Sequence, residues 1–256
     1  MTTLTLVLLC CIAFSAGFVD AVAGGGGLIQ TPASLVLLPQ FPVATVIGSL
    51  KIPAFTGTAM AVRQYVKRVS VDWPMALVMC VTAFLAAIAG SQVLLLVSNR
   101  FIKPVIFIVL VLVAIYTYTN RNFGQHTRKS HSVRRRWLYA FLISLIIGFY
   151  DGFIGPGAGS FLILAFITLL GFDFLHASAN AKLVNLSTNF GSILLFLIKG
   201  TILWRIALPM AICNGLGGLV GAHIAISRGN RFIRIFFLCI VTATLIRFGL
   251  SALFDL

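Results

Sequence analysis

Two lysines and two aspartates lie within otherwise apolar stretches, and they are the residues of this chain best suited to do chemistry. Lys51 and Lys182 stand well inside apolar runs, and Asp20 and Asp151 each lie near the end of one. Burying an ammonium or a carboxylate in lipid is costly unless the charge is paired or hydrated. We therefore expect these four side chains to form ion pairs or to line a polar cavity.

A glycine-rich break follows each of these aspartates. Gly24 to Gly27 are four consecutive glycines, and the second break reads Gly155-Pro156-Gly157-Ala158-Gly159. Within a membrane, such a break frees backbone groups that a polar partner must satisfy, and a following helix N-terminus adds partial positive charge. We expect these breaks to contribute to a small-anion site in which the two lysines carry the charge. The backbone groups expected there are those of Gly26, Gly27, Gly157 and Gly159.

Two interpretations of the charged residues remain open. In one, an aspartate and a lysine of the same half form a structural pair that joins the broken helix to its neighbour. In the other, which we favour because two equivalent lysines indicate one central cavity, Lys51 and Lys182 bind a small anion. Asp20 and Asp151 then pair with the lysines or couple transport to protons. The two interpretations are compatible, because an aspartate could hold its lysine until an anion or a proton arrives.

One predicted helix carries further polar side chains on a single face. Spacings of four, three and four residues place Ser178, Lys182, Asn185 and Asn189 on that face. The face that lies 131 residues earlier is mostly apolar and comprises Ile47, Lys51, Ala54 and Thr58. We expect the polar contacts to a substrate to come mainly from the second half. The alternative is that these side chains hydrogen-bond neighbouring helices.

The composition indicates a polytopic α-helical membrane protein. The chain has 256 residues, of which 60% are hydrophobic and only 9% are charged, and apolar runs of bilayer length recur along it. This excludes a disordered chain, a nucleic-acid-binding module and an ordinary soluble enzyme. The net charge of +14 lies in short loops beside apolar runs, where the positive-inside rule and anionic lipid headgroups account for it. The expected partners are the lipid bilayer and a small anion.

The sequence predicts an internal duplication with an offset of 131 residues. This shift places Asp20 on Asp151, Lys51 on Lys182 and Trp73 on Trp204, and these residue types are scarce in the chain. The predicted units are a first repeat over residues 1–119, a basic cytoplasmic linker over residues 120–136 and a second repeat over residues 137–256.

Each half is expected to contain four long membrane-spanning helices and one short broken or re-entrant helix. In the first half the short helix covers residues 28–38, and in the second it covers residues 161–170, both too short to cross alone. Four crossings per half would give parallel repeats and five would give inverted ones. Broken helices within inverted repeats are a common transporter design, so we favour the inverted arrangement.

Nothing in the sequence resembles a catalytic set or a metal-binding motif. The five cysteines lie within apolar runs without metal-ligand or redox spacing, and no HExxH motif is present. We therefore expect neither an enzyme nor a bound metal or cofactor.

Several motifs resemble those of a known family. The first half contains Gly17-Phe-Val-Asp-Ala-Val-Ala-Gly-Gly-Gly-Gly-Leu-Ile-x-x-Pro and then Gly48-Ser-Leu-Lys51, and the second contains Gly155-Pro-Gly-Ala-Gly and then Ala179-Asn-Ala-Lys182. These motifs resemble the sulfite exporter TauE/SafE family, also called the 4-toluene sulfonate uptake permease family, over essentially the whole chain. The resemblance implies a multi-pass carrier in the bacterial inner membrane for sulfite, sulfonates or other small organic anions. The family usually has Asn before the first lysine, where this chain has Leu50.

Three functions are consistent with these features. Secondary transport of a small anion through a central cavity between the repeats is the one we favour. An accessory membrane protein that stabilises a partner complex would tolerate substitution of the lysines. An anion channel would give currents that exceed the turnover of a carrier.

Overall fold

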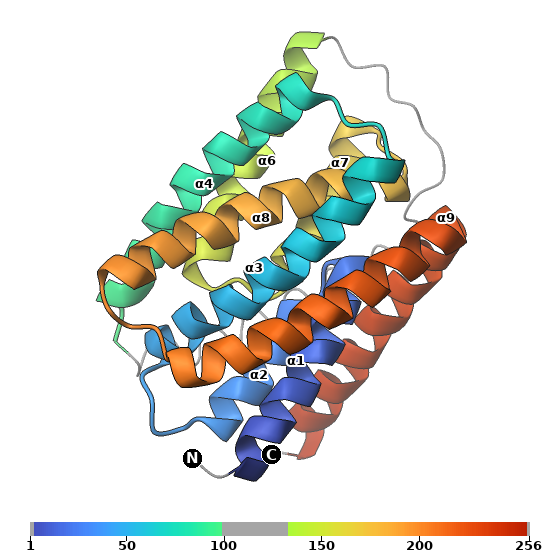
Figure 1. Cartoon of the computed structure of the whole chain (residues 1–256). Coiled ribbons are helices and arrows are strands. Elements are labelled where there is room, and N and C mark those ends of the chain that lie inside the picture. Colours follow the sequence, from blue (N-terminus) through green and yellow to red (C-terminus); the bar gives the residue numbers. More distant parts are fainter. Residues whose placement is uncertain (1–2, 99–132, 255–256) are drawn as a thin grey trace.

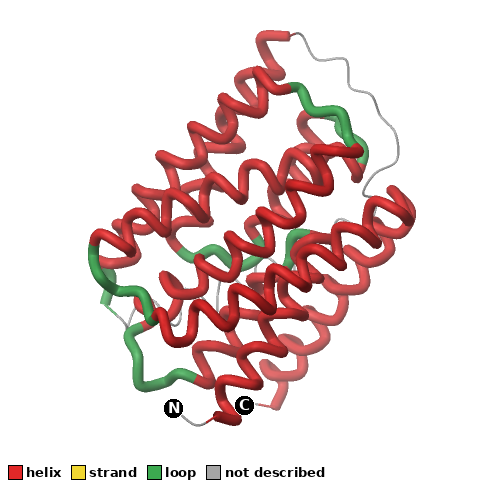
Figure 2. Tube along the Cα trace, in the orientation of Figure 1, coloured by secondary structure: helices red, strands yellow, loops and turns green. Residues whose placement is uncertain are grey.

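The computed structural model describes residues 3–98 and 133–254, and this part of the chain is entirely helical apart from its connecting loops (Figures 1 and 2). The helices are α1 (Thr3–Ala23), α2 (Gly26–Leu37), α3 (Val43–Arg68), α4 (Trp73–Leu96), α6 (Val133–Phe153), α7 (Ala158–Leu170), α8 (Phe174–Ile198) and α9 (Trp204–Phe254). Six of them are long and apolar enough to cross a membrane. This confirms the prediction of an all-α polytopic membrane protein. The predicted span over residues 101–119 lies outside the described residues.

Local sequence accounts for where several of these helices begin and bend. Asp72 and Asp173 cap α4 and α8 by accepting hydrogen bonds from the backbone N–H groups of Met75 and His176. Helix α9 bends sharply at Gly229, whose φ of 68° and ψ of −165° are not helical. Helix α6 begins at Val133, so the end of the predicted linker is helical.

The short helices α2 and α7 have 12 and 13 residues. At 1.5 Å per residue they extend for about 18 and 20 Å, less than the roughly 30 Å of a hydrocarbon core. Figure 2 shows the glycine-rich breaks that precede them as loops in the middle of the helical bundle. The breaks therefore lie where backbone groups are screened from lipid by other helices.

Corresponding helices of the two halves run in opposite directions. In Figure 1, α1 begins at the end of the molecule marked N, whereas α6 begins at the opposite end. The order of long, short, long and long helices is the same from α1 to α4 as from α6 to the first part of α9. This is the arrangement we expect of inverted repeats, although the duplication itself stays a prediction from the sequence.

The two halves interlock rather than lie apart. Helix α1 packs against α9, α3 against α8 and α9, and α4 against α6 and α8. Glycines permit some of these contacts, since a methyl group at Gly90 of α4 would overlap the backbone of Phe149, and one at Gly152 of α6 would overlap that of Ala87. A site at the centre is consequently built from both halves.

Candidate functional site

The two glycine-rich breaks meet at the centre of the molecule. The backbone N–H and the hydroxyl of Ser160 in the second half donate to the carbonyl oxygens of Gly24 and Ala23 in the first, each at 3.0 Å. Gly24 has a φ of 75°, and a methyl group there would overlap the backbone of Gly159. Close approach and a left-handed backbone both require glycine at this position.

Two ion pairs cross from one half to the other beside these breaks. The amine of Lys51 on α3 lies 2.9 Å from Oδ1 of Asp151 on α6, and that of Lys182 on α8 lies 2.9 Å from Oδ2 of Asp20 on α1. The sequence interpretation that paired each lysine with the aspartate of its own half is therefore wrong. The reason is the interlocking of the halves, which brings α3 to the end of α6 and α8 to the end of α1.

Lys51 also completes the end of helix α6. Its amine donates to the carbonyl oxygen of Asp151 at 2.6 Å. Where the helix breaks, the N–H of Gly155 donates to the carbonyl oxygen of Tyr150 and not to that of Asp151. The carbonyl oxygen of Asp151 therefore needs another donor. The cation also opposes the negative end of the helix dipole. Lys51 thereby stabilises a carboxylate and a helix terminus together.

The two pairs differ in their contact with the cavity. The side chains of Lys51 and Asp151 are 6% and 5% exposed, whereas Lys182 is fully buried and Asp20 is 19% exposed. The second carboxylate oxygen of Asp151 accepts from the hydroxyl of Thr188. The position 131 residues before Thr188 is Gly57, which has no hydroxyl to offer. Asp20 is thus the more open of the two carboxylates.

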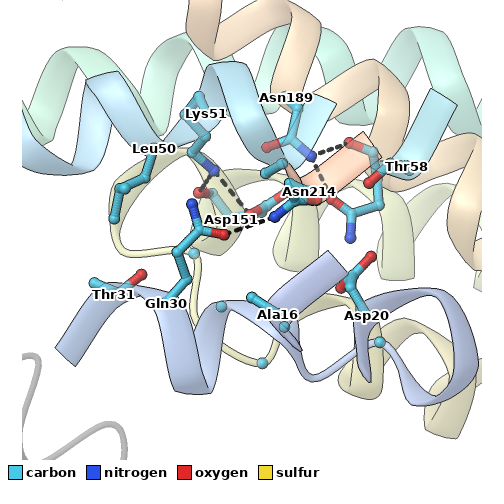
Figure 3. Close-up of a pocket in the computed structure, with 18 of the residues that line it drawn as sticks. Ala16, Asp20, Gln30, Thr31, Leu50, Lys51, Thr58, Asp151, Asn189 and Asn214 are labelled. Carbon is cyan, nitrogen blue, oxygen red and sulfur yellow. Dashed lines mark hydrogen bonds and ion pairs between the residues drawn. The ribbon is translucent and has the colours of Figure 1, made fainter. Parts of the chain in front are cut away.

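A small cavity of about 60 Å³ lies between the breaks and the two ion-paired regions (Figure 3). It has room for a few water molecules or one small anion. Most of the site residues predicted from the sequence border it, namely Lys51, Asn185, Asn189, Gly26, Gly27, Gly157, Gly159, Asp20 and Asp151. By helix geometry, the first N–H groups of α2 have no partner within the helix, and they belong to two of these residues, Gly26 and Gly27.

The structure does not bring Lys182 and Ser178 to this cavity. Both are fully buried, and the amine of Lys182 is held by Asp20, which itself borders the cavity. The expectation that two ammonium groups face one shared space therefore does not hold. Their helix face is used for packing between α8 and the first half, and the cavity begins one turn further along α8, at Asn185.

Other lining residues were not singled out from the sequence as site residues. Gln30 and Thr31 of α2 and Asn214 of α9 contribute polar side chains, and Thr58 of α3 adds another. The remaining lining residues are Ala16, Gly24, Ile47, Leu50, Ala54, Ile154 and Gly155. The polar wall thus comes from both halves and not mainly from the second. The available signal was a Gln-Thr pair inside a short apolar helix and a lone Asn beside Gly215.

Amide groups arrange the polar wall. Nδ2 of Asn189 donates to Oδ1 of Asn185 at 2.8 Å, one turn away on α8. Nδ2 of Asn214 donates to Oε1 of Gln30 at 2.9 Å, from α9 to α2. Figure 3 shows Lys51, Asp151 and Gln30 on one side of the cavity and Asp20 on the other, with Asn214 between them. Lys51, Asp20 and Asp151 border this space, and Lys182 pairs with Asp20 from behind, so the formal charges of the two pairs cancel.

Comparison with known proteins identifies the family of this chain. The model of the sulfite exporter TauE/SafE family matches residues 9–248. A probable membrane transporter protein from Haemophilus influenzae is 34% identical over 229 residues, covering 90% of this chain and 88% of its own length. A probable membrane transporter protein, ORF9, from Sinorhizobium is 33% identical over 235 residues, covering 92% of this chain and 88% of its own length.

A third relative is also named as a membrane transporter. The probable membrane transporter protein YfcA of Escherichia coli K12 is 31% identical over 238 residues, covering 91% of this chain and 86% of its own length. No solved structure gives a significant match. The family is one of membrane transporters and not of enzymes. With six helices of spanning length among the described residues, the chain is a multi-pass protein of the bacterial inner membrane, and it belongs to the sulfite exporter TauE/SafE family of membrane transporters.

Proposed function

We propose that this protein is a secondary transporter of a small anion, namely sulfite, a sulfonate or a related organosulfur anion, and that the central cavity holds the anion during transport. The observation that carries the proposal is the position of Lys51, which lines the cavity together with the glycine-rich breaks of both halves and whose amine lies beside Gly155. A cation that is already anchored by Asp151 can attract an anion without first having to be ordered.

The surroundings of Lys51 suit a small anion. Helix α2 begins at the cavity, and the helix dipole favours negative charge at its N-terminus. Helix termini directed at a substrate near the middle of a membrane are typical of transporters with broken helices. The small volume favours a compact anion over a large organic one.

Charge balance favours coupling to a proton. The two ion pairs make the site itself neutral, so an anion alone would leave an uncompensated negative charge in a poorly hydrated space. Protonation of Asp20 would restore neutrality and release its hold on Lys182. Asp20 suits this role better than Asp151, because it is 19% exposed while Asp151 is 5% exposed with both oxygens occupied. Among the described residues, Tyr65 of α3 is a further ionisable side chain near Asp20.

Flux measurements in proteoliposomes test this proposal. We expect the full-length protein to carry sulfite or methanesulfonate in a saturable manner that a proton gradient accelerates. The double variant Lys51→Gln/Asp151→Asn removes the cation without leaving a buried carboxylate unpaired. Loss of a charge-assisted hydrogen bond should lower the initial rate by about 10- to 100-fold. Lys199→Gln, which changes an exposed lysine at the end of α8, is the matched control and should behave as the wild type.

The same experiment separates the alternatives. Unchanged flux in a correctly inserted Lys51→Gln/Asp151→Asn variant would contradict the role of the cavity. Flux that fails to saturate and gives measurable single-channel currents would indicate a channel. Absence of flux for every sulfur oxyanion tested, with the wild-type protein intact, would contradict the proposed substrate class.

A further inference from the structure

One buried amide group at the cavity has an NH2 group without a hydrogen-bond partner among the described residues. Gln30 is 4% exposed, and its Nε2 has no hydrogen-bond partner among the described residues. Buried polar groups are normally satisfied, so an unpaired donor inside a protein needs an explanation. Gln30 borders the cavity, and Figure 3 shows its amide beside Lys51 and Asn214. A water molecule or a ligand in the cavity would be within reach of this NH2 group.

The orientation of this amide is fixed by a second one. Nδ2 of Asn214 donates to Oε1 of Gln30 at 2.9 Å, which leaves the NH2 group of Gln30, and not its oxygen, available to a ligand. Asn214 is 2% exposed and is itself held between two helices. A methyl group at Gly57 of α3 would overlap its Oδ1, and one at Gly17 of α1 would overlap its backbone. The donor is therefore preorganised by packing that involves α1, α2, α3 and α9.

The fold does not itself require amides at these positions. The residues that lie 131 positions away from Gln30 and Asn214 are Phe161 and Ala83, and both are apolar. Phe161 packs edge-on against Tyr150 with ring centroids 5.6 Å apart. A helix of the same kind can thus be built with an apolar residue at this place, and the Gln30–Asn214 pair is a polar feature of one side of the cavity.

We propose that Gln30 recognises an oxygen atom of the transported anion by donating a hydrogen bond from Nε2, and that Asn214 is the residue that positions it. This inference rests on the proposed function and specifies its ligand further. The ligand is an oxyanion, one of whose oxygens accepts from Gln30 while Lys51 attracts its negative charge. A sulfite or sulfonate group has several acceptor oxygens and fits this requirement.

Binding measurements on the purified full-length protein test the role of Gln30. Isothermal titration with sulfite and with methanesulfonate gives dissociation constants for the wild type and for Gln30→Leu, which keeps the size of the side chain but removes its donor. Losing a hydrogen bond to a charged ligand should weaken binding by about 10- to 100-fold. Gln64→Leu is the matched control, because Gln64 lies outside the cavity lining and donates to the carbonyl oxygen of Leu219. It should bind as the wild type does.

Two further variants separate recognition from a structural role. Gln30→Glu preserves shape but replaces the donor with a carboxylate, so it should bind more weakly than Gln30→Leu. For Asn214→Ala, we expect a smaller loss than for Gln30→Leu, and no additional loss when both changes are combined, because Asn214 acts through Gln30. Additive losses would contradict the positioning role of Asn214.

The outcomes distinguish this inference from the proposed function. Dissociation constants of Gln30→Leu and Gln30→Glu within twofold of the wild type would overturn the role of Gln30 while leaving anion transport intact. If Gln30→Leu fails to fold, the isosteric Gln30→Glu variant decides in the same way. A wild type that binds neither sulfite nor methanesulfonate would overturn the proposed function, and this inference with it.

Discussion

The amine of Lys51 lies 2.9 Å from the carboxylate of Asp151 and 2.6 Å from the carbonyl oxygen of the same residue, so it ties α3 of the first half to the end of α6 in the second. The pair between Lys182 and Asp20 makes the opposite crossing at 2.9 Å. Neither half can move relative to the other at these points without stretching an ion pair. The two pairs therefore hold the halves together, and they are the points at which binding of an anion or a proton would affect movement of one half relative to the other.

The buried pair between Lys182 and Asp20 should contribute strongly to stability. Lys182→Met leaves the carboxylate of Asp20 without its counterion, which should cost about 3–5 kcal/mol of stability. The double variant Lys182→Met/Asp20→Asn removes both charges and should regain most of that loss. Thermal unfolding in detergent measures both, with Lys199→Met as the surface control. A double variant no more stable than Lys182→Met would show that the unpaired carboxylate of Asp20 is not the cause of the lost stability.

Asp20 should determine the pH dependence of transport. Asp20→Asn is permanently neutral, so its flux should no longer respond to a proton gradient, whereas the wild-type flux should rise when the anion and protons enter from the same side. Asp151→Asn disturbs the pair with Lys51 and should lower the rate at every pH. Initial rates of methanesulfonate uptake across a pH series check this. A wild-type response to the gradient in Asp20→Asn would assign coupling elsewhere.

Gly24 should tolerate substitution less well than another glycine of similar backbone conformation. Gly24 and Gly200 have φ values of 75° and 65°, so alanine at either position costs about 1–2 kcal/mol of backbone strain. A methyl group at Gly24 would also overlap the backbone of Gly159, whereas at Gly200 nothing lies within 4 Å. Gly24→Ala should therefore lower the unfolding temperature well beyond Gly200→Ala, and equal shifts would argue against tight contact between the breaks.

The ends of the molecule that carry Arg135 and Lys199 should lie on opposite sides of the membrane. Helix α6 begins at one end, and α8 terminates at the other (Figure 1). Cysteines introduced at these exposed positions in a cysteine-free background should react with a membrane-impermeant thiol reagent from opposite faces. The positive-inside rule predicts that Arg135 is cytoplasmic. Labelling of both positions from the same face would contradict the inverted orientation.

The sequence by itself determined the class of the protein, its broken helices and the charged residues and glycines around the cavity. Apolar runs long enough to span lipid, with rare charged residues next to glycines, are compatible with few structures. The reason is that an unpaired charge or backbone group in lipid is costly. Lys51, Asp20, Asp151 and the glycine-rich breaks could be identified for that reason.

Only the tertiary structure decided which charges pair and which face the cavity. Periodicity places Lys182 on the same helix face as Asn185. In the folded protein, however, Lys182 forms an ion pair with Asp20 of α1, while Asn185 lines the cavity. Likewise, nothing local in the sequence shows that Asn214 on α9 orients Gln30 on α2. These relationships join residues far apart in the chain, and they depend on how the two halves interlock, which no local pattern encodes.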